Sequence, residues 1–228
     1  MSLKFIILTL NEPSRRDNVN QLVSILPRIR TERHPATGEP PQLFTGIKGT
    51  DLWSVSYTYN PHRRLNGQLM SSNEIACALG HLGIYQQLLD DPDHDMYCVL
   101  EDDATLVCSS QEFYEALKDI PPMDSWNIIH MADCEWYSLQ RTTLVEPSAH
   151  FCNIEKRMFN RATAYIINKA GARTLIMYSG GNGVVAKPAD DLLSNGFMEG
   201  VVKVIASTKY FFRERDENIS LINSEPPS

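Results

Sequence analysis

Met96-Tyr97-Cys98-Val99-Leu100-Glu101-Asp102-Asp103 is the stretch that decides the fold, because a short apolar run ends there in three consecutive carboxylates. A continuous apolar run of this length is typical of a strand that is covered on both faces of a sheet. The acidic residues then fall at the carboxyl end of the strand, where open α/β sheets place their ligand crevice. Neighbouring carboxylates repel one another unless they are solvated, protonated or neutralised by a cation. Two alternatives stay open: a divalent-metal site that grips a phosphorylated substrate, or a solvated turn.

Strands and helices are predicted to alternate on both sides of this stretch. Strands are expected at residues 3–10, 96–101, 126–131, 162–168 and 201–206, and helices at residues 73–90, 109–118, 169–178 and 189–195. Ser71 and Glu74 form a capping-box pattern before the first of these helices, and Asn11 can cap a further helix after the first strand. The alternation predicts an α/β fold whose central sheet is mostly parallel and is flanked by helices. The segments 53–70 and 132–160 follow no regular period.

The bulk composition is that of a globular protein, with 43% hydrophobic and 21% charged residues in a chain of 228. The net charge of -7 argues against a nucleic-acid partner, which usually requires a basic excess. No stretch reaches the roughly 18 to 20 apolar residues that span a bilayer, and residues 1–10 are predicted to be a strand rather than a signal peptide. Cys77 and Cys98 lie among apolar residues, as reduced core cysteines do. We therefore expect a cytoplasmic protein.

Five groups of residues, in a fixed order, carry a family resemblance. They are Asn11 with the pair Arg15-Arg16, then Thr45–Leu52, Glu74–His81, Leu100–Asp103, and finally Ala164–Ile167 with Gly171-Ala172 and Pro188-Ala189-Asp190. Taken together they resemble glycosyltransferase family 25, which builds bacterial lipo-oligosaccharide and includes collagen galactosyltransferases. The chain departs from the family's E-x-G-C-x-x-S-H helix at Ala76 and Gly80, where glycine and serine are usual.

The resemblance implies one Rossmann-like domain of the glycosyltransferase A type over residues 1–228. About residues 1–120 would form the nucleotide-sugar side and about 121–228 the acceptor side. The implied reaction moves a hexose, galactose being the usual one, from a UDP-sugar to a saccharide or lipid-linked saccharide acceptor such as lipo-oligosaccharide. It inverts the anomeric carbon and uses a divalent metal, Mn²⁺ by expectation.

The acidic triplet matches the family's metal motif. The resemblance makes Asp103 a direct metal ligand and Glu101 the first carboxylate of the D-x-D pattern, with Asp102 binding the donor's ribose or the metal. Carboxylate oxygens suit a hard divalent cation, and that cation would stabilise the departing nucleoside diphosphate. Many transferases of this fold add a late histidine ligand, but no histidine follows His150.

Asp190 matches the carboxylate of the family's P-x-D element. An inverting transferase needs one base that takes the proton of the acceptor hydroxyl, and Asp190 is the candidate catalytic base. Asp191 is its neighbouring competitor. The structural alternative is that Asp190 only caps a helix, since an aspartate before Leu192 and Leu193 is a common start signal.

Four further residues are candidates for donor binding: Asn11, Arg16, Glu74 and His81. Arg16, or its neighbour Arg15, follows the first strand, where a guanidinium group could reach uracil or phosphate. Glu74 and His81 are seven positions apart and share one helix face. Each has a structural alternative: Glu74 can close the capping box, His81 can be a hydrogen-bonded core residue, and the arginines can lie on a solvated face.

Two other functions compete with sugar transfer. Glu101-Asp102-Asp103-Ala104-Thr105 imitates the D-x-D-x-T motif of haloacid-dehalogenase-like phosphatases, although Glu stands where their nucleophilic Asp is needed. A non-catalytic module that binds sugar or nucleotide is the other alternative, because Ala76 and Gly80 are unusual. A basic group formed by Lys203, Lys209, Arg213 and Arg215 could touch an anionic membrane surface, which would place the protein peripherally on the inner face of a membrane.

Overall fold

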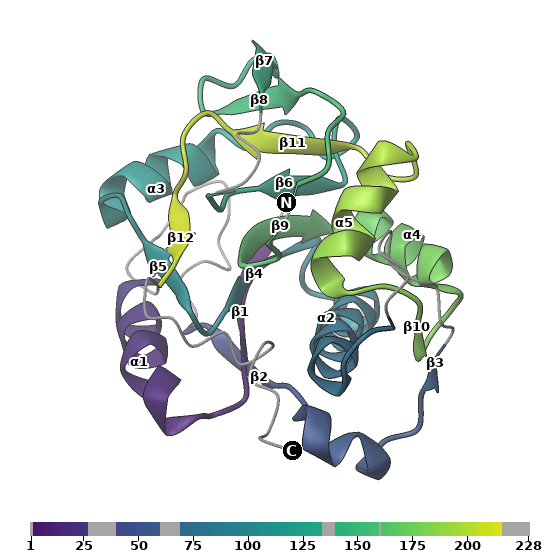
Figure 1. Ribbon diagram of the computed structural model, residues 1–228. Helices are drawn as coiled ribbons and strands as arrows, with labels where there is room; N and C mark the ends of the chain where they lie inside the picture. Colours follow the sequence, from purple (N-terminus) through teal and green to yellow (C-terminus); the bar gives the residue numbers. More distant parts are fainter. Residues whose placement is uncertain (1, 27–39, 60–68, 134–139, 160, 216–228) are drawn as a thin grey trace.

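The computed structural model describes residues 2–26, 40–59, 69–133, 140–159 and 161–215 (Figure 1). Its α-helices are α1 (Arg16–Ile25), α2 (Ser72–Asp90), α3 (Ser110–Lys118), α4 (Lys169–Ser179) and α5 (Ala189–Met198). Two 3₁₀ helices, Pro13–Arg15 and Gly49–Ser54, complete the helical elements named here. The predicted helices are therefore present, each within a few residues of the expected bounds.

An eight-stranded sheet forms the centre of the molecule. In spatial order its strands are β2 (Gln42–Thr45), β1 (Leu3–Thr9), β4 (Met96–Glu101), β9 (Ala164–Asn168), β6 (Ile128–His130), β11 (Val204–Ser207), β8 (Phe151–Ile154) and β7 (Arg141–Leu144). β1 pairs in parallel with β2 and β4, and β11 pairs in parallel with β6. β9 runs antiparallel between β4 and β6. The sheet is mixed rather than mostly parallel.

The antiparallel edge of the sheet explains part of the difference between the predicted, mostly parallel sheet and the mixed sheet that is observed. β7 and β8 form an antiparallel pair, and β8 joins β11 in the same sense. Both strands lie inside the segment 132–160, which follows no period because the sequence of β7, Arg-Thr-Thr-Leu, is mostly polar and exposed. Residues 60–68, 134–139 and 160, which belong to the two unassigned segments, lie outside the described residues.

Helices cover both faces of the sheet (Figure 1). On one face, α2, α4 and α5 pack on the even-numbered side chains of β1 and on their neighbours in β4 and β9. On the other face lie α1, α3 and a short antiparallel ladder of β5 (Ala104–Leu106) with β12 (Phe212–Glu214). A second ladder joins β3 (Thr58–Tyr59) to β10 (Val184–Val185). The sheet is thus buried on both sides, as the apolar β4 sequence predicts.

Local sequence fixes where α2 begins. The Ser71 hydroxyl accepts a hydrogen bond from the Glu74 backbone N–H (3.3 Å), and the Glu74 carboxylate accepts one from the Ser71 N–H (2.8 Å). This is the expected capping box. Asn11, in contrast, does not cap α1: it adopts a left-handed conformation with φ of 57°, and Arg15 stands at the cap position after the 3₁₀ turn that Pro13 begins.

Within the described ranges, no helix is both long and apolar enough to cross a membrane.

Candidate functional site

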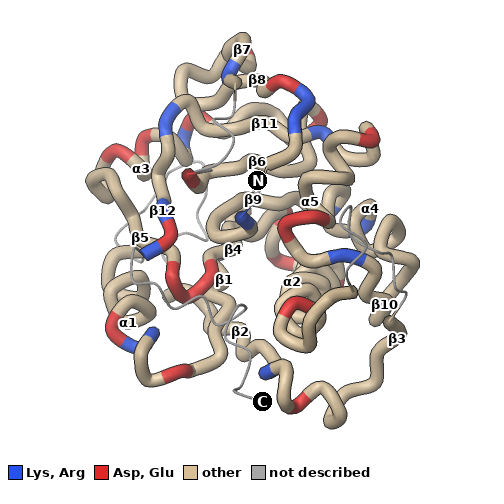
Figure 2. Tube along the Cα trace, in the orientation of Figure 1, with Lys and Arg blue, Asp and Glu red and all other residues tan. Residues whose placement is uncertain are grey.

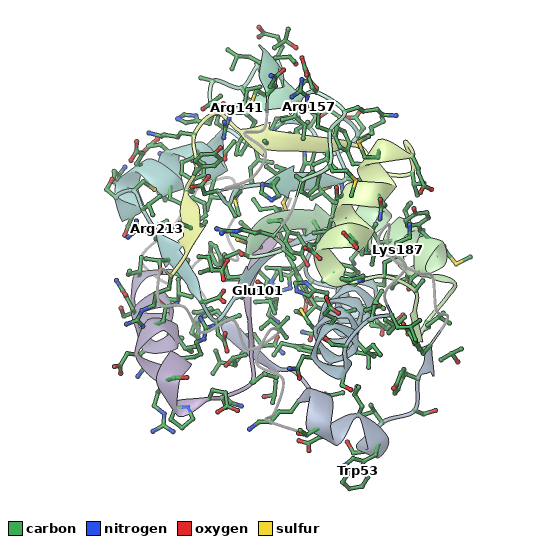
Figure 3. All side chains as sticks on the ribbon, viewed as in Figure 1. Trp53, Glu101, Arg141, Arg157, Lys187 and Arg213 are labelled. Carbon is green, nitrogen blue, oxygen red and sulfur yellow. The ribbon has the colours of Figure 1, made fainter. Side chains whose placement is uncertain are left out.

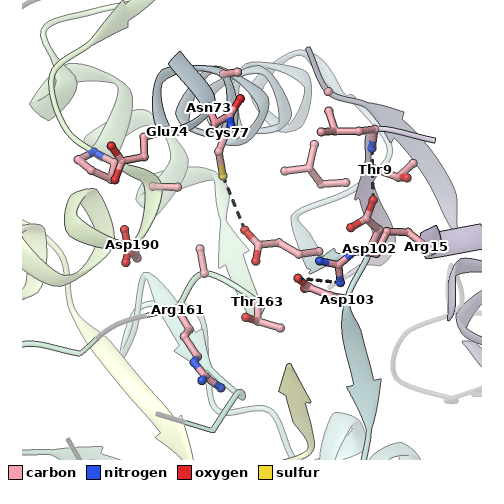
Figure 4. A pocket seen from close by; sticks show the side chains of 18 of the residues that line it. Thr9, Arg15, Asn73, Glu74, Cys77, Asp102, Asp103, Arg161, Thr163 and Asp190 are labelled. Carbon is pink, nitrogen blue, oxygen red and sulfur yellow. Dashed lines mark hydrogen bonds and ion pairs between the residues drawn. The ribbon is translucent and has the colours of Figure 1, made fainter. Parts of the chain in front are cut away.

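A cavity of about 280 Å³ lies at the carboxyl ends of β1 and β4 (Figure 4). Its walls come from the end of β1, the turn between β4 and β5, residues 161–163 before β9, and the amino-terminal turns of α2 and α5. The carboxyl ends of parallel strands are the usual ligand edge of an open α/β sheet. The acidic groups gathered around this region are visible in Figure 2. The cavity is the candidate site.

The lining is strongly acidic. Among the described residues, the carboxylates that line it are those of Glu74, Glu101, Asp102, Asp103, Asp190 and Glu214, and the cationic groups are those of Arg15 and Arg161. In Figure 3, Glu101 lies near the middle of the molecule, at the end of β4 and beside α2. Such an excess of one sign inside a walled cavity concentrates a field that attracts cations.

Asn18 of α1 holds the acidic turn in place. Its side-chain amide donates to the backbone carbonyls of Asp102 (2.9 Å) and Ala104 (2.8 Å). Asn18 and its two bonds are buried. Because unpaired buried carbonyls are costly, this one side chain fixes the path of the chain between β4 and β5.

Asp102 turns toward β1 rather than toward the open cavity. Its Oδ2 accepts a hydrogen bond from the Leu10 backbone N–H (3.3 Å), and Thr9 also bonds to the carboxylate. The residue is only 8% exposed. Burial raises the pKa of Asp102, while Thr9, Arg15 and Leu10 oppose that rise. Asp102 therefore joins the acidic turn to the end of β1.

Asp103 has one buried carboxylate oxygen without a hydrogen-bond partner. Its Oδ2 pairs with the Arg15 guanidinium group at 3.1 Å, and its Oδ1 is buried without a hydrogen-bond partner. Burial, followed by repulsion from Glu101, raises the pKa of Asp103 to about 7, although Arg15 opposes the rise. Buried polar atoms are normally satisfied. An unpartnered carboxylate oxygen beside a second carboxylate is the donor set that a divalent cation fits.

Glu101 is held by two residues of α2. His81 Nε2 lies 3.1 Å from Glu101 Oε1, and the Cys77 thiol donates to the same oxygen at 3.8 Å. His81 Nδ1 lies 2.6 Å from the Tyr165 hydroxyl, which is 3.0 Å from that of Tyr85. A chain of buried polar groups thus runs from the core to the Glu101 carboxylate. Burial, and then the charge of Glu101, raises the pKa of Cys77.

Asp190 lies across the cavity from the acidic turn (Figure 4). It sits in the first turn of α5, whose cap position is Pro188, so Asp190 is not the helix cap. Its Oδ1 accepts the backbone N–H of Asp191 at 2.9 Å. Asp190 lines the cavity, whereas Asp191 does not. Of the two neighbouring carboxylates, Asp190 is the one placed to meet a ligand there.

The structure brings together five of the predicted site residues in this cavity: Glu74, Glu101, Asp102, Asp103 and Asp190. Three others do not line it. His81 is fully buried behind Glu101, while Asn11 and Arg16 are exposed. The buried guanidinium group of the arginine pair is that of Arg15, because α1 turns Arg16 to its outer face.

Other lining residues were missed by sequence reasoning. Arg161 has a positive φ of 76° and pairs with Glu214 at 3.4 Å. Nothing in the sequence marks either residue, since they are 53 positions apart and meet only because β12 pairs with β5. Cys77 could have been found, since it is one helical turn before His81 and shares its face.

Two of the basic residues near the end of the chain bond within the protein. Lys203 Nζ donates to the backbone carbonyl of Asp124 at 3.3 Å, and Lys209 pairs with Glu112 of α3. Partnered amino groups have less free charge to offer an anionic membrane surface, so these contacts weigh against a membrane role for the two lysines.

Comparison with known proteins gives one family match. The family model described as glycosyltransferase family 25 (LPS biosynthesis protein) matches residues 1–193. A search of curated proteins found no match.

Among solved structures, the chain is similar to a glycosyltransferase involved in the glycosylation of the major capsid of PBCV-1. The TM-score is 0.53 and the identity 8%, over 96% of this chain and 95% of that chain. A Drosophila β-1,4-galactosyltransferase 7 mutant in complex with manganese, UDP-Gal and xylobiose gives a TM-score of 0.49 at 8% identity, over 100% and 76%. The galactosyltransferase LgtC with donor and acceptor sugar analogs gives 0.44 at 13%, over 88% and 72%. At such identities the likeness concerns the fold, which is of the glycosyltransferase A type.

Proposed function

The chain belongs to glycosyltransferase family 25, and we propose that it moves a hexose such as galactose from a UDP-sugar to a saccharide acceptor, with inversion at the anomeric carbon. The acceptor class is lipo-oligosaccharide or another lipid-linked saccharide. Because the chain belongs to a glycosyltransferase family, we do not pursue the phosphatase alternative. The experiment below would detect the other alternative, a protein that binds sugar or nucleotide without catalysis.

The observation that carries the proposal is the unpartnered Asp103 Oδ1 beside Glu101, in a cavity that Asp190 faces from the other side. Asp103 and Glu101 would hold a divalent metal, Mn²⁺ by preference, since both offer hard oxygen ligands. When bound, such an ion offsets the charge of the diphosphate leaving group. Arg15 keeps Asp103 in position through its ion pair.

The helices α2 and α5 both point their amino-terminal turns at the cavity. Helix amino ends carry partial positive charge and free N–H groups, which favours phosphate oxygens there. Glu74 lies in the first turn of α2, where its negative charge offsets part of this partial positive charge. Its capping-box hydrogen bond also orients the first turn. Asn11 and Arg16 are left out of the proposal because neither lines the cavity, and His81 acts through Glu101.

Asp190 is the proposed general base. An inverting transfer needs the acceptor hydroxyl and the leaving diphosphate on opposite faces of the sugar, and a base beside that hydroxyl. Asp190 is separated from the acidic turn by the width of the cavity, which is the required arrangement. In this proposal residues 1–120 supply most of the donor side and residues 121–228 supply the base and the acceptor side.

The test combines two measurements. Calorimetry with UDP should show binding that strengthens when Mn²⁺ is added, and the lack of binding in either condition would contradict the donor-site assignment.

The variant Asp190→Asn should retain UDP binding but lose sugar transfer by about 10²- to 10⁴-fold, the usual contribution of a general base. Asp191→Asn is the matched control and should retain transfer. Unchanged transfer in Asp190→Asn would remove this residue from the base role, and UDP binding without any transfer would favour the non-catalytic module.

A further inference from the structure

Three side chains of different chemistry converge at the back of the cavity. Cys77 and His81 lie four residues apart on α2, so they share one helix face, and Glu101 ends β4 opposite them. Glu101 Oε1 lies 3.1 Å from His81 Nε2 and 3.8 Å from Cys77 Sγ. All three atoms lie within 4.8 Å of one another. Of the described residues, these form the group of thiol, imidazole and carboxylate close enough to share one ion.

Two of the ligand spacings are near the edge lengths of a tetrahedral zinc site. Zinc binds sulfur at about 2.3 Å and nitrogen or oxygen at about 2.0 to 2.2 Å. Tetrahedral angles then separate the ligand atoms by about 3.3 to 3.7 Å. Glu101 Oε1 lies near that range from both other atoms, at 3.1 Å from His81 Nε2 and 3.8 Å from Cys77 Sγ. We propose that Cys77, His81 and Glu101 bind one Zn²⁺ ion, with a fourth position that opens into the cavity.

The surroundings of His81 support a ligand role. Ligating histidines normally use their second ring nitrogen to bond an oxygen that fixes the ring. His81 Nδ1 already lies 2.6 Å from the Tyr165 hydroxyl, and that hydroxyl is backed by Tyr85. Zinc binding leaves His81 neutral, with its proton on Nδ1 and donated to Tyr165, while Nε2 faces the ion. The Tyr165 hydroxyl can accept this hydrogen bond from His81 and donate its own to Tyr85, because either tyrosine hydroxyl can be the donor.

Charge also favours an ion at this position. Cys77 and Glu101 both line the cavity, so an ion can reach them from solvent. Binding converts the Cys77 thiol to a thiolate and releases one proton to the buffer, as thiolate ligation requires. A soft sulfur ligand selects zinc over Mg²⁺ or Mn²⁺, so this site differs in preference from the all-oxygen site at Asp103.

Glu101 would belong to both sites. An ion held between α2 and β4 takes the carboxylate oxygen that the donor metal would share with Asp103. Zinc should therefore weaken metal-dependent UDP binding, although the zinc site itself does not depend on sugar transfer.

The test uses the full-length, metal-free protein. Titration with Zn²⁺ in a calorimeter should show one ion per chain, and Co²⁺ should give a thiolate-to-metal charge-transfer absorption. Cys77→Ala should abolish that absorption and weaken Zn²⁺ binding by about 100-fold or more, given that even outer-shell changes cost 10- to 100-fold. Cys108→Ala, which removes a partly exposed thiol outside the group, should leave both signals unchanged.

Two further variants make the result decisive. Asp103→Asn should keep the Co²⁺ absorption, because its carboxylate is not a ligand in this site. His81→Gln should weaken Zn²⁺ binding while circular dichroism shows a folded chain. If His81→Gln does not fold, Glu101→Gln replaces it, because that substitution removes the charge but keeps the size of the ligand. Absence of Zn²⁺ binding, absence of the Co²⁺ absorption, or binding that is unchanged in Cys77→Ala would each overturn the proposal.

Discussion

Asn18 shows how one buried side chain positions the acidic turn. Replacing it with alanine removes both donors from the carbonyls of Asp102 and Ala104. Since unpaired buried acceptors cost about 1 to 3 kcal/mol, Asn18→Ala should lower the free energy of unfolding by about 2 kcal/mol and weaken binding of UDP with Mn²⁺. Denaturant unfolding and calorimetry measure the two effects. Asn20→Ala, an exposed change on the same helix, is the control; equal stability of the two variants would contradict the role of Asn18.

Asp91 should make the protein sensitive to acid. Its side chain is 11% exposed. Partial burial alone would raise its pKa, but hydrogen bonds from Tyr97, the Asp93 backbone and His94 outweigh burial and lower the pKa from 3.8 to about 2. A carboxylate whose pKa is lower in the folded state stabilises that state above the unfolded value. The contribution, about 1 to 2 kcal/mol, should be lost as the pH falls from about 4 to about 2.

The comparison of variants isolates this effect from other acidic groups. Urea unfolding of the wild type and Asp91→Asn across that pH range should show a stability difference that shrinks as the pH falls. Asp93→Asn, an exposed neighbour, should follow the wild type. A difference that stays constant with pH would contradict the assignment to Asp91.

At the scale of elements, local sequence patterns and close backbone approaches explain different parts of the structure. The capping box of α2, the apolar sequence of β4 and the helix periods are local patterns, and they predicted α2, α3, α4 and the core strands. Gly49 shows what such patterns miss. An added Cβ there would lie 2.2 Å from Asn73 Oδ1 and 2.8 Å from the Asn73 backbone nitrogen. The 3₁₀ helix that Gly49 begins therefore rests directly on the first turn of α2, a contact that no period encodes.

Gly171 gives a test of the same principle in α4. Its Cβ would lie 2.7 Å from the backbone carbonyl oxygen of Asn127. Alanine improves helix propensity by about 1 kcal/mol over glycine, but overpacking costs about 1 to 3 kcal/mol. Because the crowded atom belongs to backbone, Gly171→Ala should destabilise the protein by about 1 to 2 kcal/mol. Thermal unfolding measures the change. Met177→Ala, 70% exposed on the same helix, should have little effect, and a stabilised Gly171→Ala would refute the close contact.

At the scale of the whole molecule, the layers were predictable but the strand directions were not. Alternating strands and helices required helices on both sides of a sheet, as found. The antiparallel placement of β9 depends on the path of the chain between β4 and β9, where polar strands such as β7 carry little pattern. Five carboxylates of the cavity were predictable, because Glu101, Asp102 and Asp103 end or directly follow a strand, and Glu74 and Asp190 lie in the first turn of a helix. Their tertiary partners, Asn18, Arg161 and Glu214, were not, because each is chosen by contacts between segments distant in the chain.

The pairing of β5 with β12 has a consequence for synthesis. β5 ends at residue 106, and its partner begins at residue 212, close to the last described residue. β1, β4 and their helices can dock while the ribosome is still adding residues, since domains form as their chain emerges. The wall that contains Glu214 cannot form until more than a hundred further residues have been made. Nascent chains cut before β12 should therefore expose the acidic turn to water, and the order of translation itself delays the moment at which the cavity exists.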